Sequence, residues 1–171
     1  MDYKKTTNYL QAWRAKDTVK DWYLGGQQAS FHKIPASLAR LKEVDPDNVV
    51  DWATEDHSNV FKRAFFCPSA TCNMLQFCQP LVALDACHTQ NKKYPTQVFL
   101  ATALGGNSNI VILCYAVAPT ETKESWVWFL RLMRKSLHGI DDYWIPLIFD
   151  RAKGLLPAVE EVFPGKIHAY C

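Results

Sequence analysis

The chain has 171 residues, of which 49% are hydrophobic and 13% aromatic, and its formal net charge is only +2. This composition predicts a globular protein that buries a core, with one domain and a smaller appendage. The longest apolar run, Ile110 to Ala118, has nine residues, far fewer than the roughly 20 that cross a bilayer. The start of the chain, Met1 to Lys5, lacks the apolar centre of a signal peptide. We therefore expect an intracellular protein with no membrane partner.

Basic residues are concentrated at the front of the chain. Residues 1–42 carry eight Lys and Arg against three Asp and Glu, whereas residues 43–171 carry eleven against fourteen. Basic side chains between aromatic ones can follow a phosphate backbone and stack on bases. The alternative is a solvated helix face over an aromatic core stripe, which the sequence alone favours. The candidate DNA-contacting residues of the front are Lys4, Lys5, Arg14 and Lys16.

The front elements form a module over residues 1–79. Helical spacing over Asn8 to Leu24 ends at two glycines, and a second helix is predicted over Pro35 to Val44, with proline in its first turn. Two strands, Val49 to Thr54 and Val60 to Cys67, flank a polar turn and predict a hairpin.

The rest of the chain, residues 80–171, has a regular pattern. Residues 105–109 are rich in types that tolerate positive φ, so the strands on either side are expected to form an antiparallel hairpin. The predicted order is β-β-β-α-β-α-β, the ribonuclease H-like arrangement, in which the first strand lies beside the strand that follows the first helix. The expected strands are 81–87, 97–104, 110–117, 146–150 and 166–170, and the expected helices are 123–137 and 155–162.

Two aspartates, Asp85 and Asp150, stand at the ends of two strands that this arrangement makes neighbours. Adjacent carboxylates repel each other, and they stay ionised together only if divalent cations bind between them. A pair of Mg²⁺ or Mn²⁺ ions there could activate a water or a 3′ hydroxyl and stabilise the leaving oxygen of a phosphodiester. A third acid normally completes such a site. Glu160 and Glu161 are the candidates, and ordinary surface residues are the alternative reading.

Residues beside the two aspartates could contact DNA. Arg151 and Lys153 follow Asp150 directly and could neutralise a phosphate. His88 could donate to a phosphate or steady a water bound to Asp85, or it could have no part in the chemistry.

The six cysteines are expected to be reduced thiols, since no export signal accompanies them. The spacing Cys67-x4-Cys72-x5-Cys78 differs from that of zinc sites and indicates small buried side chains instead. His168 and Cys171 would supply only two ligands, so we expect no structural zinc.

Several segments together resemble the Mutator-like element (MULE) transposase domain, and they match it in order and spacing. The resemblance extends to the front of the chain and covers nearly all of it. The segments are Leu84–His88, Glu124–Leu130, Phe149–Leu155, Ala158–Gly165 and His168–Cys171 in the back, and Ala12–Lys16, Ile34–Leu38 and Phe61–Phe66 in the front.

The resemblance implies a DDE transposase with a ribonuclease H-like fold that cuts and rejoins DNA at terminal inverted repeats with Mg²⁺ or Mn²⁺. Asp85 matches the first catalytic aspartate and Asp150 the second. In the family the third acid, a glutamate, lies beyond a Cys-x-x-His element whose start Cys171 matches, which implies a truncated or decayed copy. Ala86 and Cys87 stand where the family usually has Gly and Thr or Ser, and alanine fits only a backbone without positive φ.

Two function classes follow. The first is a nuclear DNA transposase, whose partners are terminal inverted repeats and target DNA. The sequence leaves open whether this transposase forms a homo-oligomer. The second is a DNA-binding or regulatory protein that keeps the transposase fold without catalysis. A ribonuclease H-type nuclease is disfavoured because its helix glutamate would have to be Glu121 or Glu124, at the helix start.

Overall fold

The computed structural model describes residues 8–23, 26–55, 61–89 and 95–170, and its centre is one mixed sheet of seven strands in the order β1-β2-β5-β4-β3-β6-β7. The pairs β3–β6 and β6–β7 are parallel, and the other four are antiparallel. The strands are β1 (Val49–Thr54), β2 (Phe61–Cys67), β3 (Cys78–His88), β4 (Gln97–Gly105), β5 (Ile110–Ala118), β6 (Leu147–Phe149) and β7 (His168–Tyr170).

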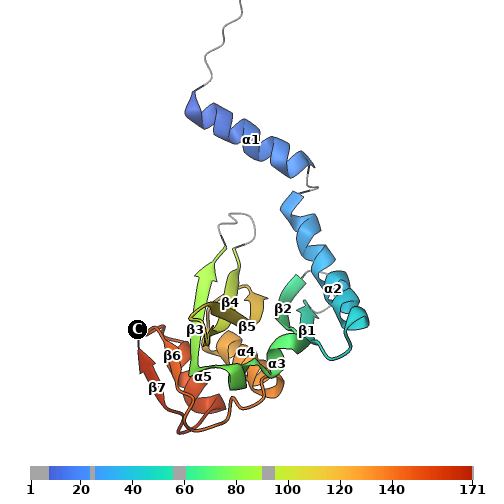
Figure 1. The fold of residues 1–171 in the computed structure, drawn as a ribbon. Helices are drawn as coiled ribbons and strands as arrows, with labels where there is room; N and C mark the ends of the chain where they lie inside the picture. Colours follow the sequence, from blue (N-terminus) through green and yellow to red (C-terminus); the bar gives the residue numbers. More distant parts are fainter. Residues whose placement is uncertain (1–7, 24–25, 56–60, 90–94, 171) are drawn as a thin grey trace, which may run out of the picture.

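The helices lie on both faces of this sheet and beyond it (Figure 1). From β3 onward the order is strand, strand, strand, helix, strand, helix, strand, as the sequence predicts. None of the described helices is long and apolar enough to cross a membrane. They are α1 (Tyr9–Tyr23), α2 (Gly26–Val44), α3 (Ser69–Cys72), the 3₁₀ helix η1 (Met74–Phe77), α4 (Lys123–Ser136) and α5 (Leu155–Val162).

The main core lies between the sheet and the helices α4 and α5. Trp126 and Phe129 of α4 are fully buried and pack against Phe99 of β4, with ring centroids 4.7 and 5.9 Å apart. They meet at tilted and edge-on angles, the geometry that aromatic rings prefer. Because α4 has one apolar stripe, burying that stripe covers this face of the sheet.

The opposite face is covered at only one end. Leu38 of α2 forms a small second core with Ala64 and Phe66 of β2. Farther along the described part of this face, Ile110 of β5 is 73% exposed. The open part of the sheet therefore faces away from α4 and α5, and this is the face to which Asp85 belongs.

Helix α2 is longer than the sequence prediction. The sequence places its start at Pro35, but α2 begins at Gly26 and contains Pro35 in its interior. Proline at an interior position removes one backbone hydrogen bond, and here the packing of Leu38 on the sheet favours the helix nonetheless. The prediction followed local propensity, which tertiary contacts override.

The structure also shows how the backbone accommodates Ala86 and where the two tryptophans of α4 lie. Ala86 lies inside β3 without positive φ, so alanine is compatible with the backbone there. Trp126 is core, whereas Trp128 is partly buried and its indole Nε1 donates to Asp51 Oδ2 at 3.0 Å. Helix α3 and the 3₁₀ helix η1 were not predicted. Both are only four residues long, too short for a periodic pattern.

The starts of α4 and α5 touch through their backbones. A Cβ added to Gly154 would stand 2.8 Å from the Lys123 nitrogen and 2.9 Å from the Thr122 carbonyl carbon. Farther along, Glu161 of α5 forms ion pairs with Lys123 and Arg131 of α4, each at 2.9 Å. The hydrogen bond from Lys123 is the main cause that lowers the pKa of Glu161 below its ordinary value.

We predict that Gly154→Ala lowers the free energy of unfolding by about 1–3 kcal/mol, the usual cost of forcing atoms into a packed site. The matched control is Gly106→Ala, because an added Cβ there has no atom within 4 Å. The control should stay within about 0.5 kcal/mol of the wild type. Urea denaturation measures both, and equal effects of the two substitutions would contradict this contact.

A second prediction concerns pH. The folded pKa of Glu161 lies below the ordinary 4.5, so its contribution to stability is present above pH 4.5 and is lost as the pH falls through the folded value. Glu161→Gln should therefore lower the melting temperature at pH 6, and the difference from the wild type should shrink as the pH falls below 4.5. The neighbouring Glu160→Gln is the control, since Glu160 is exposed. A difference that does not shrink as the pH falls would refute the role of the charge.

Candidate functional site

The first candidate aspartate, Asp85, lies in β3 on the face that α4 and α5 leave open. Val82 and Leu84 are buried, whereas Asp85 is exposed, as expected from the alternation of side chains along a strand. Its Oδ1 accepts a hydrogen bond of 2.8 Å from the backbone nitrogen of Ala86. This contact orients the carboxylate without neutralising it.

The second aspartate, Asp150, directly follows β6, which runs parallel to β3. Val82 pairs with Leu147, and Ala83 pairs with Ile148. The same register carried two residues further brings Asp85 level with Asp150 and on the same side of the sheet. Neighbouring strands lie about 4.8 Å apart, so this continued register is consistent with neighbouring carboxylates. The pairing itself ends at Ala83 and Ile148, and the adjacency of the two aspartates stays a prediction.

Neither of the two aspartates has a cationic partner within the described residues. Oδ1 of Asp150 accepts a hydrogen bond of 3.0 Å from the backbone nitrogen of Ala152. Within the described residues neither Asp85 nor Asp150 forms an ion pair. Each of the two carboxylates is therefore exposed and without a cationic partner among the described residues.

A third acid does not join this pair within the described part of the chain, where no three Asp, Glu, His or Cys side chains are grouped for a metal ion. The candidate Glu161 is held by Lys123 and Arg131, and Glu160 is exposed on α5. Glu121, considered for a nuclease site, accepts a hydrogen bond from Trp126 Nε1 at 3.2 Å.

His88 lies near the end of β3, three residues after Asp85. The Nε2 of Gln97 donates to Nδ1 of His88 at 2.9 Å, and Gln97 itself is buried. Since side chains alternate along a strand, a separation of three residues directs His88 and Asp85 to opposite faces.

Arg151 and Lys153 are both exposed and follow Asp150. The guanidinium carbon of Arg151 lies 5.4 Å from the ring centroid of Tyr170 in β7. This places one cation beside an aromatic ring, immediately after the second aspartate.

Only part of the basic front of the chain lies within the described residues. Lys4 and Lys5 lie outside the described residues, whereas Arg14 and Lys16 are exposed on α1. The aromatic side chains Tyr9 and Trp13 are 81% and 45% exposed, so the alternative of an aromatic core stripe is wrong for them. Helix α1 extends away from the sheet (Figure 1), which leaves these side chains accessible to a partner.

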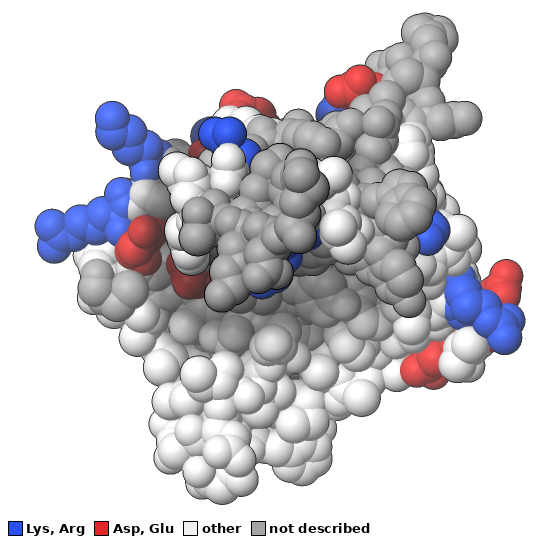
Figure 2. Space-filling view, turned by 90° about the horizontal axis from the view of Figure 1, so that it is seen from above, with Lys and Arg blue, Asp and Glu red and all other residues white. Residues whose placement is uncertain are grey.

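The surface seen from above mixes both signs of charge. Lys and Arg side chains there lie beside Asp and Glu and form no single basic face in this view of the described residues (Figure 2). A DNA contact at this end would therefore depend on particular cations rather than on a broad positive field.

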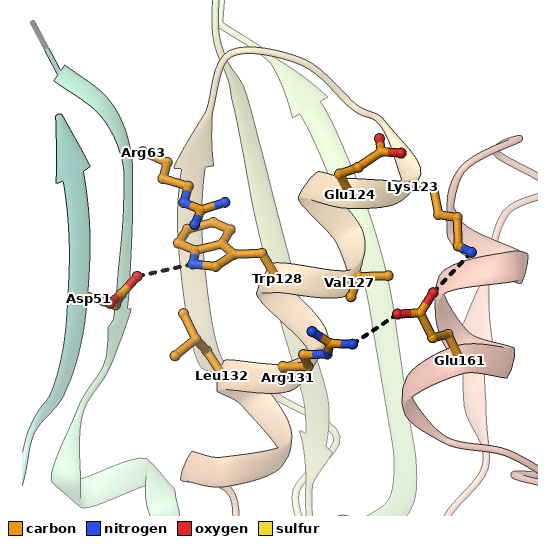
Figure 3. A pocket seen from close by; sticks show the side chains of 9 residues that line it. All are labelled: Asp51, Arg63, Lys123, Glu124, Val127, Trp128, Arg131, Leu132 and Glu161. Atoms are coloured by element: carbon orange, nitrogen blue, oxygen red, sulfur yellow. Dashed lines mark hydrogen bonds and ion pairs between the residues drawn. The ribbon is translucent and has the colours of Figure 1, made fainter. Parts of the chain in front are cut away.

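A groove along α4 was missed by the sequence analysis. It has a volume of about 570 Å³ and lies between the β1–β2 hairpin and α5 (Figure 3). Trp128 lies at its centre, with the guanidinium carbon of Arg63 4.6 Å from the ring centroid and Asp51 bonded to the indole nitrogen. In the sequence, Trp126 and Trp128 are two positions apart in one helix and so cannot share a face, which is a weak signal that one of them lies outside the core.

The predicted burial of the cysteine group holds for Cys67 and Cys72, whereas Cys78 is only partly buried. Cys67, Cys72 and Cys114 are buried, and all five cysteines of the described residues are free. Burial is the main cause that raises the pKa of Cys67 to about 12. The Cys67 thiol therefore remains protonated at neutral pH, and the buried cysteines contribute as small core side chains.

Comparisons with known proteins add one strong match. A model of the MULE transposase domain matches residues 81–171. A comparison with curated proteins finds no match. Among solved structures, the cryo-EM structure of the simian T-cell lymphotropic virus intasome in complex with PP2A regulatory subunit B56 gamma is 10% identical, with a TM-score of 0.33.

The intasome match covers 60% of this chain and 40% of that chain, and a TM-score this low supports no conclusion about the fold or function of this chain. The family match covers more than half of the chain and includes both Asp85 and Asp150. The chain therefore belongs to the MULE transposase family.

Proposed function

We propose that this chain is the catalytic core of a DNA transposase that cuts and rejoins the ends of a Mutator-like element. The observation that supports the proposal is the parallel pairing of β3 and β6, whose register, if continued for two more residues, would make Asp85 and Asp150 neighbours where the two strands end. Both are exposed there, where a DNA phosphate can approach.

The sheet supports a ribonuclease H-like classification of this core. Strands β5, β4 and β3 pair antiparallel, and β3, β6 and β7 then pair parallel. The parallel pairs are what bring the ends of β3 and β6 to the same edge. In this proposal the β1–β2 hairpin and α2 extend the core at its other end.

The two carboxylates fit a hard divalent cation, because each has a second oxygen that accepts no hydrogen bond within the described residues. Asp85 and Asp150 would hold Mg²⁺ or Mn²⁺, which when bound activates the attacking hydroxyl and stabilises the leaving oxygen. Arg151 and Lys153 would neutralise the phosphate of the cut strand. His88 has at most an indirect role in this proposal, since it belongs to the other face.

The partners follow from the same proposal. Terminal inverted repeats and target DNA would contact Arg14 and Lys16 of α1, together with Lys4 and Lys5. A transposase acts on chromosomal DNA, so we propose a nuclear location. A second copy of the chain would hold the other end of the element.

A second function stays open beside the first. Within the described residues no third acid accompanies Asp85 and Asp150, and a site with two acids is weaker than one with three. The alternative is a DNA-binding or transcription-regulatory protein derived from a transposase. The metal response separates the two functions.

We predict that millimolar Mg²⁺ or Mn²⁺ raises the melting temperature. A ligand at ten times its Kd stabilises the folded state by about 1.4 kcal/mol. Asp85→Asn should abolish the increase, whereas Asp47→Asn, at an exposed turn, should keep it. If the melting temperature of the wild type does not respond to metal, the catalytic proposal fails and the non-catalytic alternative stands.

We also predict that DNA binding by the front of the chain weakens with salt. The double substitution Arg14→Ala/Lys16→Ala should reduce the slope of log affinity against log salt by about 0.9 for each phosphate that the two side chains neutralise. Arg40→Ala is the control, because Arg40 pairs with Glu43 on α2 at 2.9 Å. An unchanged slope in the double variant would show that α1 does not bind DNA.

A further inference from the structure

A small pocket opens next to Asp150 and is absent from the sequence expectations. Its volume is about 310 Å³, at the small end of the range for ligand sites. We call it the Tyr170 pocket. Its lining residues are Arg151, Ala152, Lys153, Leu156, Pro157 and Tyr170.

The lining combines two kinds of chemistry. Ala152, Leu156 and Pro157 supply apolar surface, while Arg151 and Lys153 supply two exposed cations. Within the described residues no carboxylate lines the pocket. A ligand with a flat, weakly polar part and a nearby negative charge matches this lining, and a nucleotide has both parts.

The Tyr170 ring is held in place as one wall. It is 43% exposed, and it meets Phe149 edge-on with centroids 5.7 Å apart and His168 with centroids 5.6 Å apart. The guanidinium of Arg151 lies 5.4 Å from the ring centroid. An ordered aromatic ring beside an arginine is a typical surface for stacking an unpaired base.

The pocket and the two aspartates lie toward different faces of the sheet, and this arrangement favours an unpaired base as the ligand. Tyr170 pairs in register with Phe149, whose side chain is buried on the face that α4 and α5 cover. Asp150 is the next residue after Phe149, so strand alternation directs it to the open face. A DNA duplex bound on the open face cannot place a paired base in the Tyr170 pocket, because the pocket lies toward the other face. An unpaired base of the same DNA can rotate past the end of β6 and enter the pocket.

We infer that the Tyr170 pocket holds one unpaired nucleobase of the DNA strand, next to the phosphate at Asp85 and Asp150. Arg151 and Lys153 contact the phosphates on either side of that base. This inference rests on the proposed function, because it assumes that DNA lies at the two aspartates. The size of the pocket limits it to a single base.

The test measures affinity for a duplex with a three-nucleotide overhang, in low salt and with Ca²⁺ in place of Mg²⁺ or Mn²⁺, so that the carboxylates can hold a hard cation while cleavage is suppressed. An abasic residue replaces each overhang position in turn. Stacking of one base contributes roughly a 5- to 150-fold gain in affinity, so we expect a loss of that size at one position. Equal affinities at every position would overturn the inference.

Variants assign the effect to the ring. Tyr170→Ala should remove the preference for the base, and Tyr170→Phe should retain it because the ring remains. Tyr143→Ala is the control, since Tyr143 is 69% exposed in the turn that precedes β6, and it does not line the pocket. A preference that survives Tyr170→Ala, in a variant with an unchanged circular dichroism spectrum, would overturn the inference.

The readout separates this inference from the proposed function. Base preference that depends on Tyr170, together with no metal response, would support the pocket and reject catalysis. A metal response without base preference would support the aspartate pair and reject the pocket. Failure to bind any of the DNAs would overturn the pocket as well.

Discussion

The parallel pairing of β3 with β6 is the constraint on which the site depends. Two backbone pairs, Val82 with Leu147 and Ala83 with Ile148, fix the register. A shift of one residue would send one aspartate to the opposite face, because side chains alternate along a strand. The pairing therefore determines whether Asp85 and Asp150 form one site or remain two separate acids.

The core on the helix side holds that register. Val82 and Leu147 are fully buried, and α4 covers them together with α5. Gly154 lets the two helices approach, so that α5 begins soon after Asp150. Arg151 and Lys153 lie in the short segment between Asp150 and this contact.

Local patterns predicted most of the core, and contacts between distant segments determined the rest. The alternation in β3 and the apolar stripe of α4 depend on nearby residues, so the order of elements could be expected, whereas the adjacency of Asp85 and Asp150 stays a prediction. The start of α2 could not, because Pro35 is a helix breaker by local rules and the contact of Leu38 with the sheet lies far away in sequence. The groove at Trp128 joins Asp51 to a residue 77 positions later, and no spacing rule predicts that pairing.

The most direct test of the central claim is Mn²⁺ titration calorimetry on the wild type, Asp85→Asn, Asp150→Asn and the double variant. Residues that act on one ligand are coupled, so their effects do not add. If the two aspartates form one site, each single substitution should lose as much binding free energy as the double. Additive losses, or equal binding by all four proteins, would contradict a shared site at the ends of β3 and β6.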